Sequence, residues 1–276
     1  MSIEQTLDRA AASLGAAAGI LVCAGAGMGV DSGLPDFRGD EGFWRAYPPL
    51  KKLGMSFPEM ANPDWFSRDP ALAWGFYGHR LHLYRDTIPH AGFGILRDIA
   101  PQASRFVFTS NVDGQFQRAG FDPGQICEVH GSIHHLQTHG DSDEGIWSAD
   151  DVEVAIDRTC FRAVGPLPCS PTGRLARPNI LMFGDWGWDD TRSRAQGERL
   201  DRWLHELGGG ALVIIELGAG TAVPTVRNLS NRLLARRSST LIRINPRASA
   251  GPAGTLMLPM GARDACTALD ARLSGG

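Results

Sequence analysis

Residues 20–39 read Ile20-Leu-Val-Cys-Ala-Gly25-Ala-Gly27-Met-Gly29-Val-Asp-Ser-Gly33-Leu-Pro35-Asp36-Phe37-Arg38-Gly39. The apolar run from Ile20 to Ala24 predicts a buried strand, and four glycines follow it within nine residues. Glycines this close let the backbone turn sharply and approach a bulky anion such as a diphosphate. A tight strand-to-loop turn explains the glycines about as well. The carboxylate of Asp36, the ring of Phe37 and the guanidinium of Arg38 follow these glycines and favour a ligand site.

Length and composition limit the fold and the partners. A chain of 276 residues can form one large domain, or one domain carrying a smaller insertion. Hydrophobic residues make up 43% and charged residues 21%, which predicts a packed core rather than disorder. The net charge of -3 gives no reason to expect nucleic acid as a partner.

Neither membrane insertion nor export is expected. No apolar stretch approaches the roughly eighteen residues of a transmembrane helix, so we expect no membrane partner. The first residues carry acids early and lack the apolar segment of a signal peptide. Five scattered cysteines, an odd number, fit a reduced, cytoplasmic protein.

Strand-like and helix-like segments alternate along most of the chain. Strands are expected at 20–24, 105–109, 126–129, 179–183, 211–215 and 241–244, and helices at 3–17, 72–83, 91–100, around 200–207, 226–234 and 264–273. This alternation predicts an α/β fold with a doubly wound parallel sheet. Two stretches interrupt it. Residues 40–90 are rich in proline and aromatic residues, which predicts a lid of short helices, and residues 134–178 are polar and loop-rich.

Polar residues follow several of the expected strands. Ser110, Asn111 and Asp113 come directly after the strand at 105–109, and His130 follows the strand at 126–129. Open α/β sheets bind ligands at the carboxyl ends of their strands, so these side chains are candidates for a common site. Each also has a structural reading, because a single histidine after a strand is usually structural and Asn and Asp often cap helices.

Several separated segments resemble, in the same order, the signatures of the sirtuin (Sir2-type) family. They are Gly25-Ala-Gly27 with Ser32-Gly33-Leu-Pro35-Asp36-Phe37-Arg38-Gly39, then Thr109-Ser-Asn111-Val-Asp113-Gly114, then Glu128-Val-His130-Gly131-Ser132. Arg177-Pro178, Phe183-Gly184-Asp185, the turn at Gly218 and Ile244-Asn245 match later blocks more loosely. Together the matches span residues 20 to about 265.

The resemblance implies a Rossmann-like domain with a smaller inserted module, made of a helical lid and a remnant zinc-ribbon-like segment. It assigns 1–39, 91–133 and 179–276 to the NAD-binding domain, and 40–90 and 134–178 to the module. It also implies NAD-dependent removal of acyl groups from lysine side chains of an acylated protein or peptide. The products would be nicotinamide and an O-acyl-ADP-ribose. The sequence leaves the oligomeric state open.

Site residues are carried over from the family position by position. His130 would be the general base toward a ribose hydroxyl, Asn111 would hold a water or the ribose, and Asp113 the nicotinamide carboxamide. The NAD-binding residues would be Gly25, Ala26, Gly27, Asp36, Phe37, Arg38, Ser110, Asn111, Asp113, Gly218, Gly220, Thr221, Asn245, Asp264 and Ala265. The substrate-binding residues would be Tyr77, Arg80, Phe183 and Gly184. Asp264 has an alternative reading as a helix N-cap.

The zinc signature of the family is degraded. Its first cysteine pair is absent, and the second reads Cys169-Ser-Pro-Thr172, where a hydroxyl replaces a thiolate. We therefore expect no metal, with a rebuilt site from His134, His135, His139, Cys160 or Cys169 as the alternative. Gly29 stands where sirtuins usually carry Ser, Ser110 where they carry Gln, and Asp185 where they carry Glu, close to the peptide channel.

Tyr77 and Arg80 resemble the Tyr-x-x-Arg pair of sirtuins that accept succinyl- or malonyl-lysine. Their spacing of three places both side chains on one helix face, where they could bind a carboxylate. An ordinary amphipathic helix is the competing reading. For the whole chain, an ADP-ribosyltransferase or NAD glycohydrolase is the first alternative, and a non-catalytic NAD sensor or partner-binding module is the second.

Overall fold

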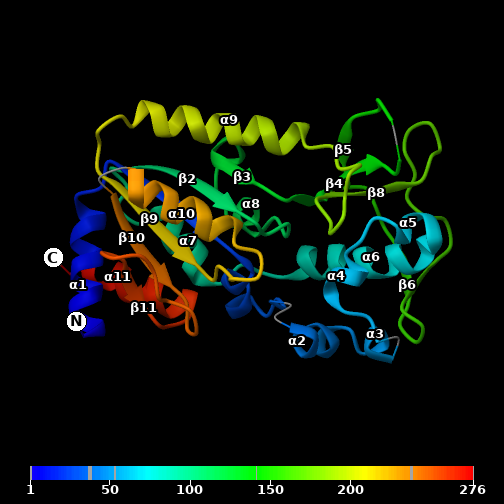
Figure 1. Ribbon diagram of the computed structural model, residues 1–276, viewed down its shortest axis with the longest axis horizontal. Helices are drawn as coiled ribbons and strands as arrows, with labels where there is room; N and C mark the ends of the chain where they lie inside the picture. The colour runs from blue at the N-terminus through cyan, green and yellow to red at the C-terminus, as the bar shows by residue number, and fades with distance from the viewer. Residues whose placement is uncertain (1, 37–38, 53, 141, 237–238, 276) are drawn as a thin grey trace.

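The computed structural model of the protein describes residues 2–36, 39–52, 54–140, 142–236 and 239–275. Its largest sheet has six parallel strands in the order β11–β10–β9–β1–β2–β3 (Figure 1). These strands are β1 Gly19–Ala24, β2 Ser104–Thr109, β3 Ile126–Glu128, β9 Leu212–Leu217, β10 Ser239–Ile244 and β11 Leu256–Leu258. The order reverses between β1 and β9. The loops leaving these two strands therefore diverge and open a crevice.

Helices cover both faces of this sheet. Helices α1 Ile3–Gly15, α7 Ala91–Asp98 and α11 Ala262–Ser274 pack on one face, and α9 Thr191–Glu206 and α10 Thr225–Arg236 pack on the other. Strand β1 is buried along its whole length, because both of its faces meet helices such as α1, through Leu7, and α9, through Leu200. The predicted doubly wound parallel sheet is confirmed.

A smaller part of the molecule lies beyond the carboxyl ends of these strands (right side of Figure 1). Its helices are α2 Gly39–Ala46, α3 Pro48–Lys52, α4 Phe57–Met60, α5 Trp65–Arg68 and α6 Pro70–Asp86. Its strands are β4 Gly131–Thr138, β5 Ile146–Ser148, β6 Ala155–Asp157, β7 Arg162–Val164 and β8 Ala176–Ile180. Prolines keep most of these helices short. The longest, α6, starts at Pro70 and is capped by Asp69, whose carboxylate accepts a hydrogen bond from Leu72 N at 3.1 Å.

An aromatic core joins the two chain segments that build the smaller part. Phe43, Tyr47 and Phe76 come from the first segment, and Phe161 from the second; all four are buried in one cluster. The ring of Tyr47 lies 5.0 Å from that of Phe76 and 5.3 Å from that of Phe161. Trp74 adds a directional contact, since its Nε1 donates to Ala176 O at 2.9 Å. The division into 1–39, 91–133 and 179–276 against 40–90 and 134–178 stays a prediction.

Two sequence expectations about strands are wrong. The apolar run at 179–183 was expected to resume the large sheet, but β8 pairs antiparallel with β4 in a separate sheet of order β5–β4–β8. Residues 134–178 also carry more strand than expected, including the antiparallel pair β6–β7. Strand β8 reads Ala-Arg-Pro-Asn-Ile and includes only Asn179 and Ile180 of the run; the apolar residues 181–183 lie in the loop after it.

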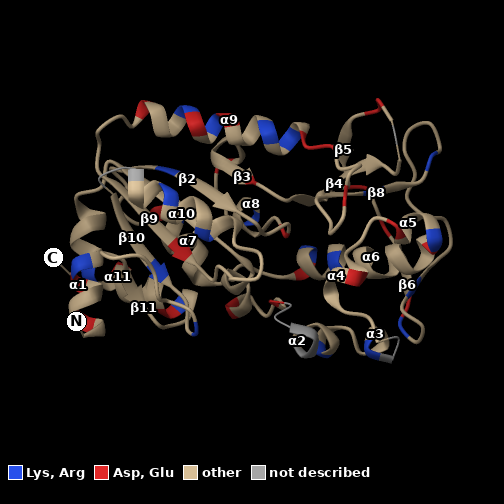
Figure 2. Cartoon of the chain, viewed as in Figure 1, with Lys and Arg blue, Asp and Glu red and all other residues tan. Residues whose placement is uncertain are grey.

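Charged side chains cover the outer surface of the larger part. Lys or Arg and Asp or Glu alternate along α9, as expected for a solvated helix face (Figure 2). Arg194 and Asp190 form one such pair at 2.8 Å. Within the described ranges, no helix has both the length and the apolar character needed to cross a membrane.

Candidate active site

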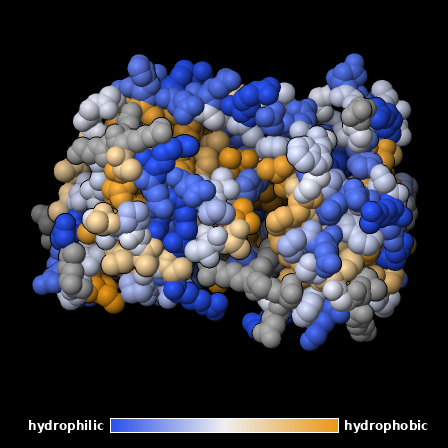
Figure 3. Space-filling view, in the orientation of Figure 1, coloured by the Kyte–Doolittle hydropathy of each residue, from blue (hydrophilic) through white to orange (hydrophobic). Residues whose placement is uncertain are grey.

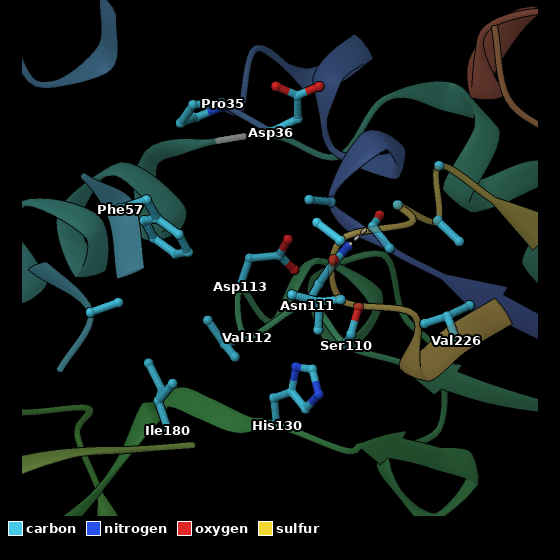
Figure 4. A pocket seen from close by; sticks show the side chains of 18 of the residues that line it. Pro35, Asp36, Phe57, Ser110, Asn111, Val112, Asp113, His130, Ile180 and Val226 are labelled. Carbon is cyan, nitrogen blue, oxygen red and sulfur yellow. Dashed lines mark hydrogen bonds between the residues drawn. The ribbon is translucent and has the colours of Figure 1, made fainter. Parts of the chain in front are cut away.

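A cavity of about 810 Å³ opens between the larger and smaller parts. Orange hydrophobic side chains lie deep in the hollow at the centre of Figure 3, and Figure 4 shows the cavity from close by. Its lining includes Gly25, Ala26, Asp36, Tyr77, Arg80, Ser110, Asn111, Asp113, His130, Phe183, Gly218, Gly220, Thr221 and Asn245. Predicted residues from seven separate stretches of sequence thus meet around one space.

Two glycine turns form the wall at the crevice between β1 and β9. Gly218 has a φ of +60°, and a Cβ atom there would lie 2.4 Å from the backbone of Gly27. A Cβ on Gly25 would lie 2.8 Å from Ala219 Cα. Gly27 N donates to Gly218 O at 3.1 Å. Gly27 therefore stands behind the wall, supporting the turn, while Gly25 and Gly218 line the cavity.

Asn111 is fixed by the end of β1. Its Nδ2 donates to Gly25 O at 3.0 Å, and its backbone N donates to Thr109 Oγ1 at 3.0 Å. Thr109 Oγ1 in turn donates to Ala24 O at 3.0 Å. This chain of hydrogen bonds ties the β2 loop to the glycine turn, so the Asn111 amide has one orientation at the cavity wall.

Asp113 is a buried carboxyl group at the cavity wall, with 9% of its surface exposed. Its Oδ1 accepts a hydrogen bond from Gln115 N at 3.0 Å, just before helix α8 Gln115–Arg118. Burial raises the pKa of Asp113 to about 6, although the Gln115 backbone hydrogen bond opposes the shift. Asp113 therefore forms a turn before α8, whose N-cap is Gly114 without a side-chain capping bond, and its carboxyl group of unusual basicity stays at the cavity.

His130 faces the cavity from the end of β3, below Ser110 in Figure 4. Burial lowers the pKa of its imidazole, and a hydrogen bond to the Ser110 backbone partly opposes this effect. Nε2 lies 3.2 Å from Thr225 Oγ1. The ring is thus neutral at pH 7 and held in place, which is the state that a general base requires.

The far end of the cavity is formed by the loops after β9 and β10. Ala219 O accepts hydrogen bonds from Asn245 Nδ2 at 3.0 Å and from Arg227 Nε at 3.2 Å. The buried Arg227 guanidinium also donates to the carbonyl of Ala248. Asn245 Oδ1 accepts from Ala248 N at 3.0 Å. One asparagine and one arginine therefore join the two loops.

Helix α6 forms the opposite wall. Tyr77 and Arg80 are buried, with 1% and 6% of their surfaces exposed, and both line the cavity. The expectation that they share one helix face holds, and Arg80 does not extend into solvent as the competing reading required. Phe57 and Phe76 pack on the guanidinium, with ring centroids 5.9 Å and 5.3 Å from Arg80 Cζ.

The loop after β8 forms one lip of the cavity. Leu181 N donates to the carbonyl of His130 and Phe183 N to the carbonyl of Ala61, both at 2.9 Å. Asp185 was expected near the peptide channel, but its side chain is buried and forms an ion pair with Arg177. Gly184 adopts a φ of +69° between these residues and lies outside the cavity lining. Asp185 shapes the lip rather than contacting its opening.

Some predicted residues lie elsewhere. Phe37 and Arg38 fall outside the described residues. Asp264 and Ala265 lie in the first turn of α11 and do not line the cavity: Asp264 is exposed, and Ala265 is packed in the core below the sheet. Sequence reasoning missed Thr225, Arg227 and Tyr84. Of these, only Tyr84 could have been found from the sequence, because it lies one helical turn after Arg80 on the same helix.

The candidate metal ligands have other partners or are dispersed. Among the described residues, no three of His, Cys, Asp and Glu are grouped to hold a metal ion. His134 Nε2 lies 3.1 Å from Asp113 O, and His139 Nε2 lies 2.7 Å from Ser67 Oγ. Cys160 and Cys169 are exposed free thiols.

Comparison with known proteins places these features in a family. The Sir2 family model matches residues 25–200. An NAD-dependent protein deacylase of Aquifex aeolicus is 30% identical over 233 residues, which cover 82% of this chain and 83% of the relative. One of Deinococcus radiodurans is 30% identical over 251 residues, covering 88% and 89%. A solved Sir2 homologue–NAD complex aligns with a TM-score of 0.69 at 22% identity, covering 97% of this chain and 93% of the other. The resemblance seen in the sequence motifs is confirmed, and the chain belongs to the Sir2 family.

Proposed function

We propose that this protein is an NAD-dependent protein-lysine deacylase that releases nicotinamide and an O-acyl-ADP-ribose. The observation that carries the proposal is the neutral His130 at the cavity wall, with Asn111 and Asp113 beside it. A pure binding module has no need for an oriented imidazole, a fixed amide and a carboxyl group of raised pKa at one opening. The curated relatives that match most of the chain are named as deacylases.

The residues present fit NAD. The cavity volume of about 810 Å³ lies in the range of ligand pockets, roughly 300–1,000 Å³. Gly25 and Gly218 line the cavity where backbone groups would meet a diphosphate, and their lack of side chains lets the two turns that form this wall pack backbone against backbone. Asn245 and the 218–222 loop lie at the end suited to the adenosine half, with Asp36 across the cavity. Phe37 and Arg38 remain candidates from the sequence alone.

When bound, NAD supplies an activated ribose carbon that captures the acyl oxygen as nicotinamide leaves. The protein's part is positioning and proton transfer. His130 accepts a proton from a ribose hydroxyl through the acceptor nitrogen of its neutral ring. Asn111 offers a fixed amide to the ribose or a water, and Asp113 accepts from the nicotinamide carboxamide. Ser110 contributes through the backbone contact that holds His130.

The substrate is an acylated lysine that enters past the lip formed by Phe183. The acyl chain then points toward Tyr77 and Arg80 on α6. A buried guanidinium favours an anionic partner, so the preferred acyl groups are acidic, such as succinyl or malonyl. Phe57, which lines the cavity, would pack against the aliphatic part of that chain.

We also infer that the smaller part is held without zinc. Thr172, which replaces the last cysteine of the family's pair, is engaged by protein groups: its N donates to Glu144 Oε1 at 3.2 Å, and its hydroxyl lies 3.2 Å from Ser170 Oγ. An ion pair at 2.6 Å between Arg162 and Asp69 links β7 to the start of α6. Metal analysis of purified protein should find less than one zinc per chain, and a stoichiometric zinc would refute this inference.

The decisive experiment follows nicotinamide release with NAD and a panel of acetyl-, malonyl- and succinyl-lysine peptides of one sequence. Peptide-dependent release, with loss of the acyl mass from the peptide and a new small product of the mass of acyl-ADP-ribose, supports the deacylase. Equal release without peptide indicates an NAD glycohydrolase, and a protein or peptide carrying ADP-ribose indicates a transferase. If the protein bound NAD but released no nicotinamide, and His130→Ala bound NAD equally well, only the non-catalytic NAD sensor would remain.

A further inference from the structure

The wall made by α6 contains a third polar side chain that the proposed function has not used. Tyr84 lies one helical turn after Arg80, lines the same cavity and is buried, with 5% of its surface exposed. Four residues separate the two side chains, so they share one face of the helix. The Tyr77 and Arg80 pair does not by itself explain a tyrosine at this position.

The Arg80 guanidinium is anchored on the Tyr84 hydroxyl. Arg80 Nε donates to Tyr84 Oη at 3.1 Å, and Arg80 Nη2 donates to the same oxygen at 2.8 Å. These two bonds use both acceptor positions of the phenol oxygen, which leaves its hydrogen to be donated. The hydroxyl therefore presents an O–H donor directly beside a positive charge.

The residues around the Tyr84 hydroxyl favour its use as a hydrogen-bond donor to an anion. The rings of Tyr77 and Tyr84 lie 5.7 Å and 5.4 Å from Arg80 Cζ, and the Arg80 side chain is largely buried at the cavity wall. Burial raises the pKa of Tyr84, so the hydroxyl keeps its proton. Tyr77 Oη is also buried at the cavity and has no hydrogen-bond partner among the described residues. A buried polar atom without a partner is costly unless a ligand provides one.

We propose that Tyr84 is a specificity-determining residue, whose hydroxyl binds the terminal carboxylate of an acidic acyl chain together with Arg80 and Tyr77. The inference rests on the proposed acidic-acyl deacylase and extends it to a third side chain on the same face of α6. Anchoring by Tyr84 fixes the guanidinium before the substrate arrives, which reduces the entropy lost on binding. An acetyl chain ends in a methyl group, which offers no acceptor to the Tyr84 and Tyr77 hydroxyls.

Asp113 is the competing acceptor for the Tyr84 proton. The two groups are close enough for the Asp113 charge to contribute to the raised pKa of Tyr84. If the hydroxyl served Asp113, its removal would affect the nicotinamide end of the cavity rather than the acyl end. The KM for NAD and the kcat/KM for the two acyl peptides therefore distinguish a Tyr84 hydroxyl that serves Asp113 from one that binds the acyl carboxylate.

The experiment compares the wild-type protein with Tyr84→Phe on acetyl- and succinyl-lysine peptides of identical sequence. We expect kcat/KM for the succinyl peptide to fall about 10- to 100-fold, the usual effect of losing hydrogen bonds to a charged group. For the acetyl peptide, kcat/KM and the KM for NAD should stay within about 2-fold. Tyr47→Phe is the matched control, because Tyr47 is equally buried near Arg80 but lies outside the cavity lining. It should leave the selectivity unchanged.

Each outcome bears on a different claim. A wild type without any succinyl preference would overturn both the acidic-acyl proposal and the role of Tyr84. A preference that is lost in Arg80→Met but kept in Tyr84→Phe would overturn the role of Tyr84 alone. Equal losses of kcat/KM on both peptides, or a raised KM for NAD, would overturn the proposal. They would mean that the Tyr84 hydroxyl serves Asp113 or the stability of the fold instead. Should Tyr84→Phe fail to fold, Tyr84→Gln offers both an acceptor for Arg80 and an N–H donor. It should then retain part of the succinyl preference, and full loss would count against the proposal.

Discussion

The Nε2 atom of His130 lies 3.2 Å from the hydroxyl oxygen of Thr225, the first residue of α10. Ninety-five residues separate the two in sequence. The contact connects the candidate base, at the end of β3, to the helix that follows the second glycine turn. Formation of that turn and orientation of the imidazole are therefore linked through one hydroxyl group.

We expect His130→Ala to lower kcat by about 100- to 10,000-fold, the usual contribution of a general base. Thr225→Val, which keeps the shape of the side chain, should lower kcat by roughly 2- to 10-fold and leave the KM for NAD unchanged. Burial lowers the pKa of His130 below its ordinary 6.5, so wild-type activity should persist down to pH 6.5 and fall below it. Steady-state kinetics across pH 5–9 would check all three; a normal kcat for His130→Ala would contradict the assignment.

Asp113 should lower the stability of the folded state at neutral pH. Its pKa is raised from 3.8 to about 6, so the folded state holds more protons than the unfolded state between these values. The free energy of unfolding then falls as pH rises through this window, and the penalty persists above pH 6. Asp113→Asn should raise the free energy of unfolding by roughly 3 kcal/mol at pH 8, and by less than about 1 kcal/mol at pH 4. Activity should fall at the same time.

Urea unfolding at both pH values measures the effect of Asp113→Asn. Asp122→Asn is the control, because Asp122 makes the same kind of turn, accepting from Gly124 N at 2.8 Å, but is exposed. It should change stability little at either pH. A stabilisation by Asp113→Asn that is equal at pH 4 and pH 8 would show that charge burial is not its cause.

Gly218→Ala should separate the two glycine turns. The new Cβ would lie 2.4 Å from the Gly27 backbone, at a φ of +60°. Strain and overpacking together should cost about 2–5 kcal/mol and abolish NAD binding. Gly220→Ala, in the same loop, meets no atom within 4 Å and should leave the stability unchanged. Thermal unfolding and NAD titration would check both variants; wild-type stability of Gly218→Ala would contradict the close approach.

Arg227 should act on NAD binding without touching the reacting groups. Arg227→Met removes the hydrogen bonds to Ala219 O and Ala248 O that hold the two loops together. We expect the KM for NAD to rise about 10-fold, with kcat changed less. Arg232→Met, an exposed position on the same helix, should change neither. If Arg227→Met lowered kcat alone, the loops would not depend on this side chain for nucleotide binding.

Much of the fold could be predicted from the sequence because the strands of the large sheet are short apolar runs that end at glycines or polar residues. The site residues after β1, β2 and β3 were found for the same reason, since parallel strands bring their carboxyl ends to one edge. The errors concern long-range pairing. Only Asn179 and Ile180 of the run at 179–183 belong to β8, and their pairing with β4 decides the sheet. Thr225 could not be connected to His130, because no local pattern records a contact across ninety-five residues.

The hydrogen bond between Trp74 Nε1 and Ala176 O spans 102 residues of chain. A ribosome adding roughly 5–20 residues per second needs about 5–20 s to make the second partner after the first. Until then the indole and the neighbouring Phe43, Tyr47 and Phe76 have no second segment to pack against. The newly made first half of the protein thus exposes a cluster of aromatic rings to solvent, which is the kind of surface that chaperones bind.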